Sequence, residues 1–93
     1  MKIRVHLMGQ LRGILQQDEA EIELPFAATV QDALVLIAAR HESARLQFVT
    51  EQGEIRPSLL LVVNDAAIPA RQAASIQLNE QDHLTILPPI SGG

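Results

Sequence analysis

Cysteine is missing from this 93-residue sequence, and so are tryptophan and tyrosine. The absence of cysteine excludes disulfides, thiolate metal sites and a cysteine nucleophile. Aromatic residues make up only 2% of the chain, whereas hydrophobic residues make up 47%. A folded core must therefore be built from Leu, Ile, Val and Ala, and any reactive group on this chain is not a thiol.

Basic residues are few and scattered: seven Lys and Arg stand against eleven Asp and Glu, a formal net charge of −4. A nucleic-acid interface needs clustered basic residues and usually aromatic residues for stacking, so no nucleic-acid partner is expected. No apolar run approaches the roughly 20 residues that span a bilayer. Lys2 to His6 alternates polar and apolar residues, unlike a signal peptide. We therefore expect a single cytoplasmic domain with no membrane partner.

Period-two patterns predict an antiparallel hairpin at the start of the chain. Lys2 to Met8 alternates, with Ile3, Val5 and Leu7 on one face, and Ala20 to Leu24 alternates again. The stretch between these segments is polar and contains glycine, which predicts a long connecting loop.

A helix is predicted from Val30 to His41. Thr29 has the position of an N-cap residue, and Asp32 three residues later completes a variant of the capping box. Apolar residues then fall on one helical stripe, which Val35 and Leu36 broaden. We expect this helix to pack on a sheet and to be a main support of the core, because each buried aliphatic side chain contributes about 1.5–3 kcal/mol.

Further strands and turns are predicted in the second half. The stretch from Ser43 to Ser58 is irregular, with Leu46, Phe48 and Val49 as packing candidates. A continuous apolar run at 59–63 is typical of a strand that is covered on both faces or borders a partner. The other expected elements are a turn at Asn64-Asp65, an edge strand from Ala66 to Pro69, and a last strand from His83 to Leu87, which Pro88-Pro89 ends.

The order of hairpin, helix and later strands predicts an α+β fold of two layers. With a later strand inserted between its neighbours, the pattern fits the β-grasp, the architecture of ubiquitin. We expect a mixed sheet of about four or five strands crossed by one main helix. Residues 1–88 are expected to form this domain, and residues 89–93 a flexible tail.

Two glycines, Gly92 and Gly93, follow the proline pair after a short interval. At a background of about 7% glycine, a random chain has this ending about once in 200. Glycine has no Cβ and a free choice of φ, which suits a carboxylate that must enter a narrow active site. Residues 88 to 93 reach about 20 Å when extended, at roughly 3.3 Å per residue. The alternative is a frayed terminus without function.

Several stretches resemble the MoaD/ThiS family of ubiquitin-like sulfur carriers. The most specific is the ending from Leu84 to Gly93, LTILPPISGG. The first strand followed by Gln10-Leu11-Arg12, the Thr29-Val30 helix start and the Val62-Val63-Asn64 turn are also similar. The Gln81-Asp82 step departs from the usual Gly-Asp pair of the family, which is expected to loosen that turn without changing the terminal chemistry.

The resemblance implies a protein co-substrate rather than an enzyme. A ubiquitin-activating-type adenylyltransferase would adenylate the Gly93 carboxylate with ATP and Mg²⁺ held on that partner, and a persulfide would then convert the product to a thiocarboxylate. Gly92 would be an essential spacer. A second enzyme, such as the large subunit of molybdopterin synthase, would accept the sulfur. No cofactor is expected on this chain itself.

The receiving pathway and two rival functions stay open. The Pro-Pro-Ile-Ser-Gly-Gly ending is most similar to the molybdopterin branch of the family, whereas the length and the Phe48-to-Pro57 insertion resemble the cysteine-synthesis branch. Thiamine-thiazole synthesis is a further destination in the family. The rival functions are a protein modifier that forms isopeptide bonds through Gly93 and a binding domain with an inert tail.

Strand alternation also predicts where a partner docks. Met8 and Leu87 should point away from the core on neighbouring strands and form an apolar anchor, unless they are ordinary scattered surface residues. The predicted partner-binding residues are Met8, Leu87, Pro88, Pro89, Ile90 and Ser91. No metal site is predicted, because the three histidines, His6, His41 and His83, fall on separate elements without a further ligand at helical spacing.

Overall fold

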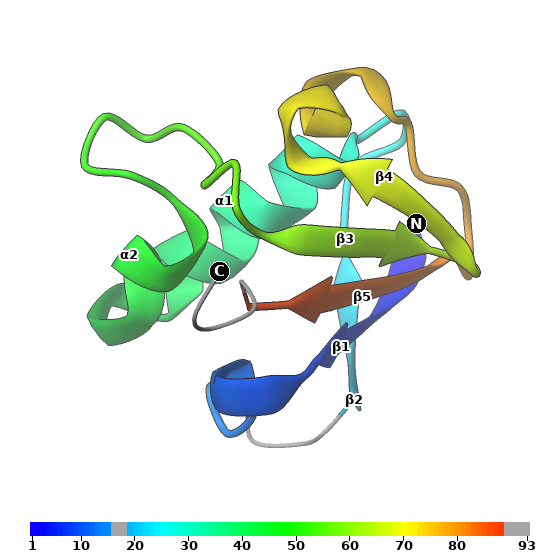
Figure 1. Ribbon diagram of the computed structural model, residues 1–93. Coiled ribbons are helices and arrows are strands. Elements are labelled where there is room, and N and C mark those ends of the chain that lie inside the picture. The colour runs from blue at the N-terminus through cyan, green and yellow to red at the C-terminus, as the bar shows by residue number, and fades with distance from the viewer. Residues whose placement is uncertain (16–18, 89–93) are drawn as a thin grey trace.

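The computed structural model describes residues 1–15 and 19–88 of the chain. They contain one five-stranded sheet (Figure 1), whose strands are β1 (Lys2–Leu7), β2 (Glu19–Glu23), β3 (Leu60–Val63), β4 (Ala66–Pro69) and β5 (His83–Leu87). The helical elements are α1 (Val30–Arg40), α2 (Arg45–Phe48) and the 3₁₀ segments η1 (Gly9–Leu11), η2 (Glu42–Ala44) and η3 (Ala70–Ser75). The tail predicted at 89–93 lies outside the described residues.

The strands are arranged in the order β2-β1-β5-β3-β4. β1 and β2 form the predicted antiparallel hairpin, and β3 and β4 form a second one. The last strand, β5, lies between these hairpins, parallel to β1 and antiparallel to β3. Figure 1 shows α1 behind the sheet. This mixed sheet with one main helix on one face confirms the predicted β-grasp fold.

The helix α1 begins at Val30, as predicted, because Thr29 caps it. The Thr29 hydroxyl accepts a hydrogen bond from the Asp32 amide (3.2 Å), and the Asp32 carboxylate accepts one from the Thr29 amide (2.8 Å). The capping box thereby provides partners for amide groups at the start of the helix. The helix ends at Arg40, one residue earlier than predicted, and His41 is its C-cap. Five of its residues are buried: Val30, Ala33, Leu34, Ile37 and Ala38.

Two apolar side chains lie outside the core, contrary to prediction. Val35 was expected to broaden the packing stripe of α1 and Leu46 was a packing candidate, but each is 43% exposed. A residue step in an α-helix turns the side chain by about 100°, which directs Val35 away from the face that carries the buried Leu34. Phe48 and Val49 do pack, as expected, and Phe48 is fully buried.

The core lies between α1 and one face of the sheet and is almost entirely aliphatic. Phe48 is its aromatic member, whereas the chain's other aromatic residue, Phe26, is 88% exposed. Buried residues alternate along the neighbouring strands β1 and β5: Ile3, Val5, Leu7, Leu84 and Ile86. Because side chains point alternately to the two faces of a strand, this burial determines which residues are left on the outer face.

Candidate functional site

The central strand β5 carries the chain to the last described residues. It is hydrogen-bonded to β1 on one side and to β3 on the other. Leu84 and Ile86 are fully buried, so packing anchors the strand as well. Leu87 and Pro88 are half-buried. The fold therefore sets the point at which the chain leaves the sheet, while residues 89–93, with the predicted reacting glycines, lie beyond the described part.

Apolar residues gather at the end of the sheet where the central strand β5 finishes. They are Met8, Leu60, Leu87 and Pro88, hereafter the tail end. Leu87 is directly opposite Leu60 on β3. Met8 follows β1, and its amide donates a hydrogen bond to the Ile86 carbonyl at 3.0 Å. The structure thus brings Met8 and Leu87, the two predicted anchors, to the same end of the sheet.

Leu60 is the member of the tail end that the sequence did not single out. The apolar run at 59–63 predicted a strand either covered on both faces or bordering a partner. The structure covers one face only: Leu61 is 1% exposed, whereas Leu60 is 44% exposed. The sequence did contain this information. A strand that is apolar at both odd and even positions places some apolar side chains on the outer face of the sheet.

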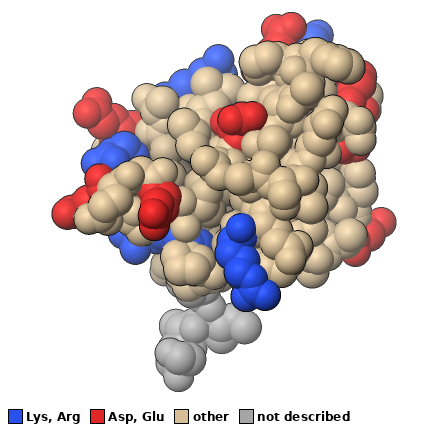
Figure 2. Space-filling view, turned by 90° about the horizontal axis from the view of Figure 1, so that it is seen from above, with Lys and Arg blue, Asp and Glu red and all other residues tan. Residues whose placement is uncertain are grey.

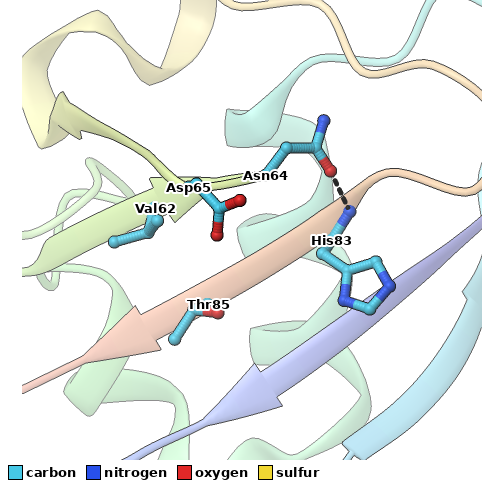
Figure 3. A pocket seen from close by; sticks show the side chains of 5 residues that line it. All are labelled: Val62, Asn64, Asp65, His83 and Thr85. Carbon is cyan, nitrogen blue, oxygen red and sulfur yellow. Dashed lines mark hydrogen bonds between the residues drawn. The ribbon is translucent and has the colours of Figure 1, made fainter.

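Polar residues occupy the opposite end of the sheet, where β5 begins. They are Asn64, Asp65, Asp82 and His83, hereafter the turn end. The Asn64 side-chain amide donates to the Asp82 carboxylate (2.9 Å), and the His83 amide donates to the Asn64 side-chain oxygen (2.9 Å; Figure 3). The second Asp82 carboxylate oxygen accepts from the Asn79 amide (2.7 Å). These bonds tie the turn before β5 to the β3–β4 hairpin.

A hollow of about 380 Å³ lies at the turn end, lined by Val62, Asn64, Asp65, His83 and Thr85 (Figure 3). Small-molecule sites are usually concave enough to bury a ligand and are lined mainly by apolar groups. Here Asn64, Asp65 and His83 are exposed. The hollow is therefore a shallow depression in the outer surface and lacks the enclosure of a catalytic pocket.

The turn at Gln81 is closed, although the sequence predicted a looser one. The Gln81 amide donates to the Lys2 carbonyl at 2.7 Å, and the Arg4 amide donates to the Asp82 carbonyl at 2.9 Å. Gln81 has φ of 69°, in the left-handed region that glycine adopts readily. A glutamine at this position therefore carries backbone strain of about 1–2 kcal/mol, while the turn keeps its hydrogen bonds.

Among the described residues, the histidines and the acidic side chains do not gather at one site. His6 lies on β1, His83 on β5, and His41 at the end of α1. Within residues 1–15 and 19–88, no group of three His, Asp or Glu side chains is placed to hold a metal ion. On the face shown in Figure 2, charges of both signs are scattered and uncharged atoms cover most of the surface. No helix in the described part has the length and apolar character needed to cross a membrane.

Comparisons with known proteins connect the fold to one family. A model of the ThiS family matches residues 5–93. SAMP1 from Haloferax volcanii is 22% identical, with 100% of both chains covered and a TM-score of 0.83. A Pyrococcus furiosus protein described as a proposed molybdopterin converting factor, subunit 1, is 26% identical over 96% of this chain and 98% of its own, with a TM-score of 0.74.

A third similar structure is the Amycolatopsis orientalis BexX/CysO complex, in which a chain is 24% identical over 98% of this chain and 99% of its own, with a TM-score of 0.66. At 22% and 24% identity, the first and third likenesses show a shared fold. The match to the family model begins within β1 and continues to the last residue of the sequence.

Proposed function

The chain belongs to the ThiS family of ubiquitin-like sulfur carriers, and on that premise we propose that it carries activated sulfur on the carboxylate of Gly93. The observation that carries the proposal is the family match, which runs through Gly93. The glycine pair is therefore part of the region shared with the family. Gly93 is the reacting residue in this proposal, Gly92 is a spacer without a side chain, and the folded domain is the part that partner enzymes recognise.

The proposed chemistry starts from a carboxylate, which is a poor electrophile. A Gly93 carboxylate oxygen attacks the α-phosphorus of ATP on the adenylyltransferase, and pyrophosphate leaves. The terminal sulfur of a persulfide then attacks the acyl carbon and AMP leaves, and a thiol reduces the resulting acyl disulfide to the thiocarboxylate. Because this chain has no cysteine, the persulfide and the thiol both come from partners.

The tail end supplies a docking surface beside the reacting group. We propose that Met8, Leu87 and Pro88 contact each partner together with Pro89, Ile90 and Ser91. Aliphatic side chains that become buried in a contact are worth about 25 cal/mol per Å² of apolar area. Binding the domain next to the tail also holds the carboxylate near the reacting groups, which lowers the entropic part of the barrier. The adenylyltransferase and the sulfur acceptor need the same tail, so they bind in turn.

We propose molybdopterin synthesis as the receiving pathway, with the large subunit of molybdopterin synthase as the acceptor. The Pro-Pro-Ile-Ser-Gly-Gly ending supports this choice. So does the Pyrococcus furiosus protein, whose 26% identity exceeds the 22% and 24% of the other two structures. Cysteine synthesis and thiamine-thiazole synthesis are the alternative destinations, and the Phe48-to-Pro57 insertion is the feature that favours cysteine synthesis.

Reconstitution with an activating enzyme tests the proposal. The purified chain is mixed with a ubiquitin-activating-type adenylyltransferase from the same organism, ATP and Mg²⁺, and the exchange of pyrophosphate into ATP is measured. A persulfide donor and a thiol are then added. Intact-mass analysis should show a form in which one oxygen is replaced by sulfur. Deleting Gly93 shifts the carboxylate back by about 3.3 Å and should lower the exchange rate by more than about 100-fold, with the melting temperature almost unchanged.

The outcomes separate the rival functions. If an adenylyltransferase that is active on another carrier gives neither exchange nor sulfur incorporation here, the proposal fails and a binding domain with an inert tail remains. Adducts on lysines of other proteins, without any thiocarboxylate, identify a modifier. Lys2 is the single lysine of this chain, so Lys2→Arg shows whether any adducts join copies of it. Sulfur transfer from the thiocarboxylate form to purified acceptor enzymes of the three pathways then identifies the destination.

A further inference from the structure

The turn after β1 lies against the residue at which the chain leaves β5. Gly9 opens η1 directly after Met8, whose amide is bonded to the Ile86 carbonyl. The turn is closed by its own hydrogen bonds, from the Leu11 amide to the Met8 carbonyl (3.1 Å) and from the Arg12 amide to the Gly9 carbonyl (3.1 Å). Gly9 therefore lies in a turn that is held by hydrogen bonds within the turn and by the Met8 bond to the end of β5.

Gly9 leaves the space that the Pro88 ring needs. A Cβ atom on Gly9 would lie 2.9 Å from Pro88 Cγ and 3.2 Å from Pro88 Cδ. Real Cβ atoms essentially never approach another heavy atom closer than 3.0 Å, so any side chain at this position forces the ring or the turn to move. Gly9 also has φ of 59°, which L-residues with a side chain rarely adopt.

The two other glycines of the described ranges provide the contrast. Gly13 (φ 92°) and Gly53 (φ 85°) also need a positive φ, but a Cβ on either would meet nothing within 4 Å. Backbone conformation alone thus accounts for Gly13 and Gly53. At Gly9 a second requirement is added, which is contact with Pro88.

We propose that Gly9 is a positioning residue for the C-terminal tail. By admitting the Pro88 ring onto the η1 turn, Gly9 sets the place and direction in which the chain leaves the sheet. Proline has a fixed φ of about −65°, so a ring held on one side begins the tail in one orientation. A pre-oriented start reduces the freedom that the tail loses when it enters an active site. This inference rests on the proposed function, in which the tail delivers Gly93.

The contact is tested with Gly9→Ala and its matched control Gly13→Ala. Both variants place a side chain at a positive φ, so both should lose thermal stability, and Gly9→Ala should lose more because its Cβ also meets Pro88. Only Gly9→Ala also displaces Pro88. We expect kcat/KM for adenylation of the chain, measured by pyrophosphate exchange, to fall about tenfold in Gly9→Ala and to stay within about twofold of the parent in Gly13→Ala.

A double-mutant cycle with Pro88→Ala separates contact from strain. Pro88→Ala removes the Cγ and Cδ atoms that the new Cβ of Gly9→Ala would meet. We expect Pro88→Ala alone to lower kcat/KM about threefold, because the tail loses its fixed start and the partner loses the contact with the ring. Gly9→Ala should have almost no further effect in that background. Non-additivity of this kind indicates that the two residues act through one contact.

The results of these experiments distinguish a failure of the positioning role from a failure of the proposed function. If Gly9→Ala and Gly13→Ala have equal kcat/KM, or if the effects of Gly9→Ala and Pro88→Ala simply multiply, the positioning role is wrong while the proposed function stands. If the parent chain is not adenylated at all, the proposed function fails first. Should Gly9→Ala prove unfolded, Pro88→Gly tests the same contact from the other side. A Pro88→Gly variant with parental stability and parental kcat/KM would also overturn the inference.

Discussion

The two ends of β5 are built from opposite kinds of interaction. At the turn end, Asn64 and Asp82 are joined by a side-chain hydrogen bond and each also pairs with a backbone amide. At the tail end, the interactions include the backbone bond from Met8 to Ile86, the strand pairing of Leu87 with Leu60, and the close approach of Pro88 to Gly9. Side-chain hydrogen bonds hold the beginning of β5, whereas apolar side chains surround its end.

This difference separates a part that specifies the fold from a part that is open to partners. The hydrogen bonds of Asn64 are satisfied within the domain, so the turn end needs nothing further to be stable. Leu60 is 44% exposed. Covering its apolar area with another surface is favourable because that area is then removed from water. In the proposed function, the adenylyltransferase and the sulfur acceptor provide that surface.

The largest effect is expected when a charge is placed at the tail end. Leu87→Asp should weaken binding of the adenylyltransferase by about 30-fold, or about 2 kcal/mol, because a carboxylate would be buried without a partner in the contact. The dissociation constant is measured by calorimetry with purified proteins. His83→Asp is the matched control, since it makes a similar change on the same strand and the same face but at the turn end.

Equal weakening by Leu87→Asp and His83→Asp would break the comparison. It would mean that the partner covers the whole outer face or responds to the net charge of the domain. Unaltered binding in both variants would place the docking surface elsewhere. Melting temperatures of both variants are measured alongside, so that a loss of folding is not mistaken for a loss of contact.

A smaller effect, on stability only, is expected at the turn end. Asn64→Ala removes the bonds to Asp82 and His83 and places alanine at a φ of 52°. We expect the free energy of unfolding to fall by about 1–1.5 kcal/mol, which lowers the melting temperature by about 4–8 °C per kcal/mol in a domain of this size. Urea unfolding followed by circular dichroism measures it. Asn64→Gly, which keeps the positive φ without strain, should lose less.

Binding of the adenylyltransferase should be the same for Asn64→Ala as for the parent chain at temperatures where both are folded. A large change in the dissociation constant would show that the turn end takes part in docking. An unchanged melting temperature would show instead that water replaces the Asn64 bonds at no cost, and that strand pairing and the remaining turn bonds are enough to hold the start of β5.

The smallest effect is a stabilisation at Gln81. Gln81→Gly relieves the positive φ of 69°, and part of this gain is offset because glycine makes the unfolded chain more flexible. A net gain of about 0.5 kcal/mol is expected. Gln52→Gly is the control, because Gln52 is exposed and does not have a positive φ, so it should be neutral or slightly destabilising. A loss of stability in Gln81→Gly would mean that the glutamine side chain makes a compensating contact.

Local patterns were sufficient for most elements. Period-two alternation predicted β1 and β5 nearly to the residue, and the Thr29–Asp32 pair predicted the start of α1, because these signals depend on neighbours in the sequence. The positions of Met8 and Leu87 followed from the same alternation. Val35 was predicted wrongly, because a stripe of apolar residues shows what is able to pack but not how wide a face the sheet covers.

The amino-acid sequence by itself determined the aliphatic nature of the core, the helix cap, the strand faces and the Gly92-Gly93 ending, since each depends on residue type and spacing. Only the tertiary structure decided that the apolar run at 59–63 leaves Leu60 outside and that Gly9 meets Pro88. The physical reason is distance along the chain. Gly9 and Pro88 lie in segments far apart in sequence, and they meet only because β5 inserts parallel to β1 at the centre of the sheet.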